Sequence, residues 1–254
     1  MKIVVSIGGS VLARELQPEK FAAYAEAIKE LGKDHTVFIV TGGGKAAREY
    51  IKVARDLGSD EATCDLIGIE LTRLNARLLI AALGDAAYYE PPVNYKEARN
   101  ASLVGKIVVM GGVTPGQTTD AVSAVLAEYT GADLLINATS IDGVYTSDPK
   151  KNKDAKKFET MTPHQLIEIV MKTEMVAGAN SPFDLLAAKI IERSNIRTIV
   201  LNGEDPQNIV DVIHKKNTGT IIEKDKKGEK KSVKNGLEKD TCNLGYYSDI
   251  GCDN

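Results

Sequence analysis

Four short apolar runs in this chain each end in a glycine-rich or polar turn. The runs span residues 2–7, 37–41, 106–110 and 133–137, and apolar residues at helical spacing follow the first three turns. Runs this short and this apolar favour strands that are buried on both faces of a parallel sheet. Ligands bind beyond the carboxyl ends of the strands in such sheets, so we expect the four turns to meet at one edge of a single sheet.

The turns after the first two runs are suited to binding phosphate. Gly8, Gly9 and Ser10 follow the first run, and three glycines at 42–44 follow the second. Glycine lets backbone N–H groups approach an anion closely, and the start of a helix adds unpaired donors and a partial positive charge. Each turn alone could be a tight connection of any α/β protein, because neither matches the dinucleotide or the P-loop fingerprint. Their recurrence predicts an anion-binding crevice.

The third and fourth turns add polar side chains to this crevice. The third turn, at 111–120, carries hydroxyl groups on Thr114, Thr118 and Thr119. These hydroxyls could reach a phosphate or a base edge, or could cap the next helix. In the fourth turn, Asp142, Tyr145 and Asp148 offer a flat ring for a base and acceptors for hydroxyls, or form a polar loop capped by aspartates. Together, the four turns suit the binding of two phosphorylated ligands that meet end to end. Few of their residues suit covalent catalysis.

Periodicity predicts the remaining elements. Helices are expected at 18–32, 61–83, 163–170, 184–194 and 206–214, and further strands at 197–201 and 218–222. The segment 86–101 contains Pro91 and Pro92 and is predicted to be a short strand followed by a surface excursion. Most charges of the helix at 61–83 are interpreted as a solvated face.

Composition limits the classes of partner. The 254 residues, of which 43% are hydrophobic, suit one large or two small domains, and the net charge of -3 gives no reason to expect nucleic acid or a membrane. No apolar run is long enough to span a bilayer and the start does not resemble a signal peptide, so a cytoplasmic protein is expected. The cysteines and histidines have no metal-ligand spacing, so no metal site is predicted. After Glu223 lysines dominate and periodicity is lost, which predicts a domain at 1–223 and a disordered tail at 224–254.

Five segments of this sequence resemble a known family. They are IGGS at 7–10, TGGGKAAR at 41–48, GGVTPGQTTDA at 111–121, TSIDGVYTSDP at 139–149 and LLAAKIIERS at 185–194. In this order they are similar to the amino acid kinase superfamily and, within it, to the archaeal-type uridylate (UMP) kinases. The resemblance covers the chain from Met1 to about Glu223.

The resemblance implies a fold and a reaction. The fold is a three-layer αβα sandwich around a mainly parallel sheet, commonly assembled as a homohexamer. The reaction is transfer of the γ-phosphate of ATP, with Mg²⁺ carried by the nucleotide, to UMP to give UDP in pyrimidine nucleotide biosynthesis. Two alternatives stay open: a superfamily kinase for another small acceptor such as isopentenyl phosphate, and a non-catalytic nucleotide-binding assembly. The isopentenyl phosphate kinases usually have histidine after the triple glycine, where this chain has Lys45.

The resemblance also implies site residues. For ATP they are Gly9, Ser10, Gly44, Arg48, Thr139, Tyr145 and Asp148. For UMP they are Gly43, Asp65 as the acceptor of ribose hydroxyls, Val113, Thr114, Pro115, Gly116, Gln117, Thr118 and Thr119. The catalytic candidates are Lys189, Asp184 and Arg48.

Two departures from the family pattern affect the catalytic candidates. Many members carry lysine where this chain has Ser6 and Ser10, so Lys189 and Arg48 are expected to neutralise the charge of the transition state. Relatives tend to have Asp-Pro-Leu where this chain has Phe183-Asp184-Leu185, which leaves the backbone beside Asp184 less constrained.

Overall fold

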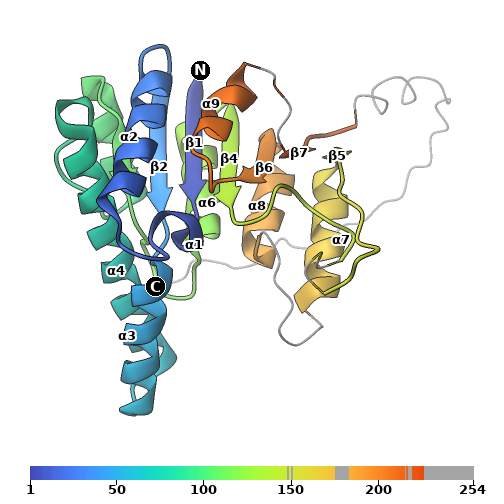
Figure 1. Ribbon diagram of the computed structural model, residues 1–254, viewed down its shortest axis with the longest axis horizontal. Helices are drawn as coiled ribbons and strands as arrows, with labels where there is room; N and C mark the ends of the chain where they lie inside the picture. The colour runs from blue at the N-terminus through green and yellow to red at the C-terminus, as the bar shows by residue number, and fades with distance from the viewer. Residues whose placement is uncertain (148, 150, 175–182, 215, 217–218, 226–254) are drawn as a thin grey trace, which may run out of the picture. The chain divides into compact units, whose positions relative to one another are not determined.

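A mainly parallel β-sheet forms the centre of the unit Met1–Lys224 (Figure 1). The computed structural model describes residues 1–147, 149, 151–174, 183–214, 216 and 219–225. Among these residues, seven strands lie in the order β3-β2-β1-β4-β6-β7-β5. The strands are β1 (Lys2–Ile7), β2 (Thr36–Thr41), β3 (Val108–Met110), β4 (Leu134–Thr139), β5 (Thr160–Met161), β6 (Thr198–Asn202) and β7 (Gly219–Ile222). All neighbouring strands pair in parallel except β6 and β7.

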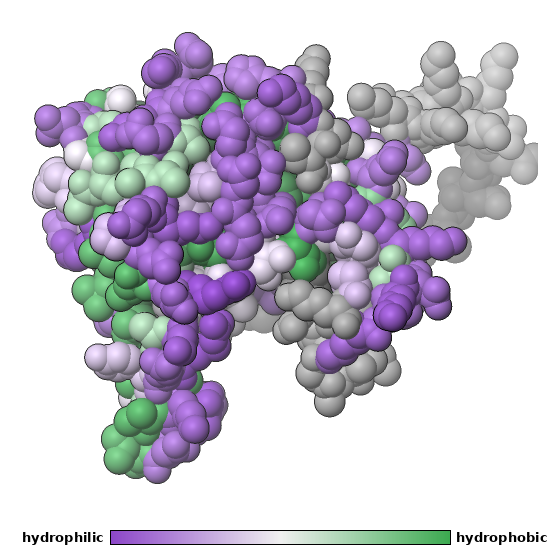
Figure 2. Space-filling model, viewed as in Figure 1, coloured by the Kyte–Doolittle hydropathy of each residue, from purple (hydrophilic) through white to green (hydrophobic). Residues whose placement is uncertain are grey.

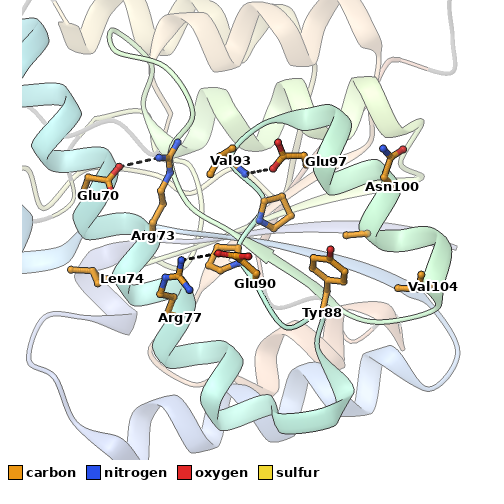
Figure 3. A pocket seen from close by; sticks show the side chains of 13 residues that line it. Glu70, Arg73, Leu74, Arg77, Tyr88, Glu90, Val93, Glu97, Asn100 and Val104 are labelled. Atoms are coloured by element: carbon orange, nitrogen blue, oxygen red, sulfur yellow. Dashed lines mark hydrogen bonds and ion pairs between the residues drawn. The ribbon is translucent and has the colours of Figure 1, made fainter.

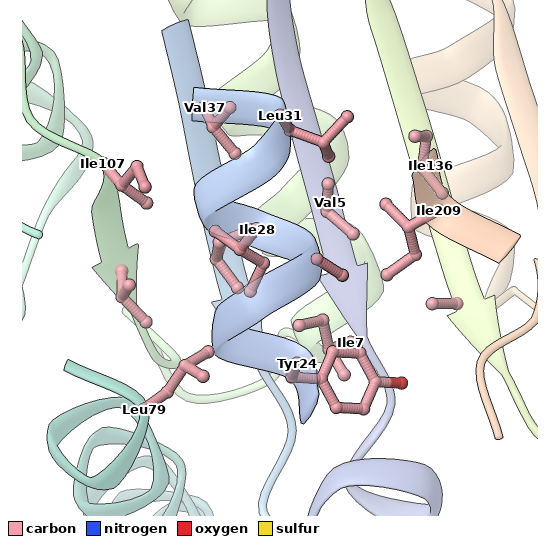
Figure 4. Close-up of a cluster of buried hydrophobic side chains, with 14 of the residues drawn as sticks. Val5, Ile7, Tyr24, Ile28, Leu31, Val37, Leu79, Ile107, Ile136 and Ile209 are labelled. Atoms are coloured by element: carbon pink, nitrogen blue, oxygen red, sulfur yellow. The ribbon is translucent and has the colours of Figure 1, made fainter. Parts of the chain in front are cut away.

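Both faces of the sheet are buried, and this explains the continuous apolar runs of the sequence. Side chains of β1 alternate: Ile3, Val5 and Ile7 enter one hydrophobic cluster, and Val4 enters the other. The first cluster lies under α2, where Tyr24 and Ile28 and their neighbours face the strands (Figure 4). The expected sandwich of a sheet between two helical layers is confirmed.

The helices divide between the two faces. The first layer contains α1 (Gly9–Leu12), α2 (Pro18–Gly32), α4 (Glu61–Leu83) and α9 (Gln207–Ile213). The second layer contains α5 (Tyr95–Ala101), α6 (Thr119–Thr130), α7 (Pro163–Glu174) and α8 (Leu185–Ser194). Helix α3 (Gly44–Asp56) packs on α4, and two short 3₁₀ turns lie at Gly84–Ala86 and Ser102–Val104. No described helix is both long enough and apolar enough to cross a membrane.

Helix α3 projects beyond the carboxyl edge of the sheet (Figure 1). Its far end carries exposed apolar side chains, including Val53 and Leu57 (Figure 2). The residues that the helix buries are all small: Gly44, Ala47 and Ala54. The helix can therefore approach α4 closely.

The prediction for 86–101 was partly wrong. Ala87 does form a single parallel bridge to Ile107, but Tyr95–Ala101 is the helix α5. Its start is capped twice: Asn94 Oδ1 accepts from Glu97 N at 2.9 Å, and Glu97 Oε2 accepts from Val93 N at 3.1 Å. This reciprocal cap begins a helix directly after the two prolines. The short β5 and α1 were also missed, whereas the prediction of a tail at 224–254 falls almost wholly on residues outside those described.

Candidate active site

The two glycine turns after β1 and β2 pack directly against each other. A Cβ atom on Gly9 would lie 2.1 Å from Gly44 N, and one on Gly42 would lie 2.3 Å from Gly9 N. Gly44 also has a φ of +71°, and its Cβ would lie 2.2 Å from Ala13 O. No side chain fits at these three positions, so the backbones of the two turns are in direct contact. The contact follows from the register of the strands, which sets Ile7 beside Thr41.

A cleft of about 380 Å³ opens at these turns. Residues that follow β1, β2 and β3 line it together with Asn137 and Thr139 at the carboxyl end of β4, so these four strands open at one edge of the sheet, although the predicted side chains of the fourth turn do not reach the lining. Ten of the predicted site residues line it: Gly9, Ser10, Gly43, Gly44, Arg48, Asp65, Gln117, Thr118, Thr119 and Thr139. Helix α4 forms one wall with Asp65, Gly68, Ile69 and Thr72.

The other predicted site residues that the structure describes are not part of the cleft lining. Val113, Thr114, Pro115 and Gly116 belong to the same loop as Gln117 but do not line the cleft. Asp148 is outside the described residues. Tyr145, Asp184 and Lys189 are described and are not part of the lining.

Arg48 is a cation at the mouth of the cleft. It lies at the start of the second turn of α3, is exposed, and its side chain has no hydrogen bond or ion pair to any residue within the described part of the chain. Lys189 is also exposed, on α8, between the buried Ala188 and Ile190. An arginine without an internal partner is available to bind a phosphate bidentately.

Asp184 and Thr118 connect two helices. Thr118 Oγ1 accepts from Ala121 N at 3.1 Å, so the hydroxyl caps α6, and it also donates to Asp184 Oδ2. Asp184 Oδ1 accepts from Ala187 N at 2.8 Å and caps α8. Of the two roles considered for the threonines, capping is the one that the geometry of Thr118 displays. These bonds fix the carboxyl end of the third turn against α8, which carries Lys189.

Asp120 lines the cleft and was not among the predicted site residues. Its Oδ1 accepts from Ser6 Oγ at 2.9 Å, and Ser6 itself is fully buried on β1. Burial raises the pKa of Asp120 to about 7; the hydrogen bond from Ser6 opposes this shift and the nearby Asp184 adds to it. Ser6 is therefore the direct partner of a carboxyl group in the cleft. The available sequence signal was the position of Asp120 directly after Thr118 and Thr119 in the third turn.

Asp65 holds the tip of the third turn. Its Oδ2 accepts from Gly116 N at 2.7 Å, and Gly116 has a φ of +79°, a conformation that glycine adopts readily. One oxygen of this carboxylate thus shapes the loop. The other has no partner among the described residues and can accept from a ligand hydroxyl.

Tyr145 lies on a short antiparallel bridge to Lys157. Its hydroxyl donates to Asp142 Oδ1 at 2.7 Å, and Lys157 Nζ lies 3.1 Å from Asp142 Oδ2. The hydrogen bond to Asp142 first, and burial second, raise the pKa of Tyr145 and keep its hydroxyl protonated. The predicted aromatic and acidic features of the fourth turn are thus bonded to each other.

A larger hollow of about 630 Å³ lies elsewhere, between α4 and the segment that carries α5 (Figure 3). Arg73 and Arg77 point into it and pair with Glu70 and Glu90 at 3.0 and 3.1 Å. None of the predicted site residues lines this hollow. The charges there are already paired, so the smaller cleft with its glycine turns is the better anion site.

Comparison with known proteins agrees with this geometry. A family model described as the amino acid kinase family matches residues 1–202. The uridylate kinase of Methanococcoides burtonii is 60% identical over 213 residues, which cover 84% of this chain and 91% of that protein. The uridylate kinase of Halorubrum lacusprofundi is 54% identical over 224 residues, covering 87% and 93%.

Solved structures are similar over the same region. The crystal structure of uridylate kinase from Archaeoglobus fulgidus has a TM-score of 0.81 at 50% identity, covering 87% of this chain and 100% of that one. The UMP kinase from Ureaplasma parvum has a TM-score of 0.73 at 28% identity, covering 88% and 99%. The matched residues include the glycine turns, the third turn and α8. This chain therefore belongs to the amino acid kinase family.

Proposed function

We propose that this protein is a UMP kinase that transfers the γ-phosphate of ATP to UMP to give UDP. The observation that carries the proposal is the direct contact between the two glycine turns, which gives one cleft two adjacent sets of backbone donors. Two phosphorylated ligands can then lie end to end, as phosphoryl transfer requires. The uridylate kinases of M. burtonii and A. fulgidus, at 60% and 50% identity, support UMP as the acceptor.

The mechanism needs no protein nucleophile. Gly9 and Ser10, at the start of α1, and Gly44, at the start of α3, present backbone N–H groups to phosphate oxygens. Arg48 covers charge that develops on the transferred group, and Lys189, on the helix capped by Asp184, is the second proposed cation. Thr139 and Tyr145 are proposed to lie beside the adenosine, and the third turn beside UMP.

Mg²⁺ is proposed to arrive with ATP. The hydroxyl groups of Ser10 and Thr139 in the cleft lining are oxygen donors, the type that Mg²⁺ prefers, so the lining is compatible with the ion. When bound, the ion neutralises phosphate charge. The remaining work of the site is to orient the two nucleotides and to exclude water between them.

We also propose that the protein forms a homo-oligomer, which the family resemblance predicts to be a hexamer. The proposed location is the cytoplasm. Leu66, Leu74 and Leu78 on α4 are exposed in the single chain, with relative exposures of 53%, 54% and 45%. Contact with another copy would remove this apolar surface from water.

A coupled assay with Mg²⁺-ATP tests the function. UMP should be phosphorylated, and isopentenyl phosphate should be a poor acceptor. If isopentenyl phosphate were phosphorylated faster than UMP, the protein would still be a kinase of this family, but its acceptor would be isopentenyl phosphate. Binding of both nucleotides without turnover would favour the non-catalytic alternative.

A further inference from the structure

Helix α4 holds the turns that follow β2 and β3 through two buried polar side chains. Asn75 Nδ2 donates to Gly42 O at 2.8 Å, and Thr72 Oγ1 accepts from Gly112 N at 2.7 Å. Thr41 Oγ1, at the end of β2, donates to the backbone oxygen of Thr72 at 2.9 Å. Thr72 and Asn75 are only 7% and 5% exposed, and neither belongs to a segment of the family resemblance.

The bond from Asn75 supplies a restraint that the glycine turn lacks. Gly42 can carry no side chain, because its Cβ would lie 2.3 Å from Gly9 N. A peptide between two glycines rotates at little cost, since glycine tolerates backbone conformations that other residues avoid. Gly42 N is already fixed by its bond to Ile7 O at 2.9 Å. The bond from Asn75 to Gly42 O therefore holds the peptide that joins Gly42 to Gly43.

The orientation of this peptide decides where the Gly43 N–H points. The peptide is trans, so its C=O and N–H point in opposite directions. Because Gly42 O faces Asn75, the Gly43 N–H faces away from that side chain. Gly43 lines the cleft, whereas Asn75 does not, and the Gly43 N–H has no hydrogen-bond partner among the described residues. This donor is therefore left for a ligand in the cleft.

Thr72 has the opposite effect on the third turn. Its hydroxyl accepts from the N–H of Gly112, and Asp65 accepts from that of Gly116 at 2.7 Å, so both amides are already engaged. The side chains of α4 thus influence which backbone donors of the cleft remain available. The available donor on Gly43 lies directly before α3, where the helix dipole favours an anion.

We propose that Asn75 is a positioning residue that turns the Gly43 N–H toward the phosphate of the acceptor nucleotide. Asn75 does not touch the ligand and acts by holding the carbonyl group of the same peptide. Without this bond the peptide can rotate, and the Gly42 oxygen then faces the phosphate and repels it. The inference rests on the proposed function and on the assignment of Gly43 to UMP.

Asn75→Leu is the first test, because leucine has nearly the shape of asparagine and no hydrogen-bond donor. The KM for UMP, and its Kd from calorimetry, should rise about ten-fold, as expected when a hydrogen bond to a charged group is lost. The Ki of uridine as a competitor of UMP should change by less than about two-fold, because uridine has no phosphate to lose that bond. A substitution that only disturbed the fold would weaken both ligands.

Asn208→Leu is the matched control. Asn208 Nδ2 donates to Asn202 O at 2.9 Å, so the substitution removes the same kind of bond between two residues that do not line the cleft. This control should lower Tm and leave both the KM for UMP and the Ki of uridine at the parent values.

Asn75→Ala is the second test, since its smaller side chain fits the site without strain. It should show the same selective loss of UMP affinity. An equal loss for UMP and uridine in either variant, or an unchanged Kd for UMP in both, would overturn the inference. Calorimetry of the parent separates this outcome from failure of the proposed function, in which the parent itself neither binds nor phosphorylates UMP.

Discussion

The carboxyl group of Asp120 should make the stability of this protein depend on pH, and Asp120→Asn should remove that dependence. In the folded chain its pKa is raised to about 7 from an ordinary value of 3.8. The folded state therefore holds a proton that the unfolded chain releases. The stability contributed by this proton is complete below about pH 4 and is lost as the pH rises through about 7.

The size of the effect follows from the two pKa values. For a single group with these values, the free energy of unfolding falls by about 2.5 kcal/mol between pH 5 and pH 8. The asparagine has no proton to release, and its amide oxygen can still accept from Ser6. The variant should therefore gain about 2.5 kcal/mol relative to the parent over this interval.

Urea unfolding of both proteins at pH 5 and pH 8 measures this difference, since other titrating groups cancel in the comparison. Asp34→Asn is the control, because Asp34 is an exposed carboxylate after α2. Its effect should stay within about 0.5 kcal/mol at both pH values. A difference between Asp120→Asn and the parent that stays constant with pH, or that shrinks toward pH 8, would refute the argument that burial governs this carboxyl group.

Four further outcomes are expected. Gly9→Ala should lower Tm and abolish ATP binding, both measurable by thermal shift with and without ATP, because its Cβ would lie 2.1 Å from Gly44 N; an unchanged Tm would mean that the turns can separate. Lys189→Ala should lower kcat about 10²-fold with little change in KM, and unchanged kcat would assign the role to Arg48 alone. Asp65→Asn should raise KM for UMP but not for ATP in steady-state assays; equal KM values for parent and variant would limit Asp65 to supporting its loop. A chain truncated after Glu223 should keep its activity and Tm, and a large loss of either would show that the remaining residues contribute to the fold.

The arrangement of the cleft could be predicted because it depends on local signals. A parallel strand has one carboxyl end, so the glycine turns after residues 7 and 41 had to open at the same edge of the sheet. The glycines of the two turns indicated a backbone that an anion can approach closely, whereas the direct contact between the turns is seen only in the structure. The order of the strands along the chain and the glycines that follow them were sufficient to predict where the cleft opens.

Asp120 and the helix α5 were missed for different physical reasons. The role of Asp120, on α6, depends on Ser6, which lies far away in the sequence on β1, and sequence spacing does not reveal that pairing. The helix α5 was missed because Pro91 and Pro92 indicated irregular structure, and the short cap formed by Asn94 and Glu97 was overlooked. Helices of one or two turns have too little periodicity to oppose a neighbouring breaker.

Because of the contact between the glycine turns, the stability of the folded chain also depends on the concentration of nucleotide. Each turn acquires its final shape only when the other is in place, so β1, β2 and the starts of α1 and α3 must all be assembled before a phosphate can bind. A partly folded chain then has no affinity for the nucleotide. A ligand at about 1,000 times its Kd would stabilise the assembled chain by about 4 kcal/mol. When nucleotide is depleted, proteases would therefore degrade the protein faster, in addition to the loss of catalysis.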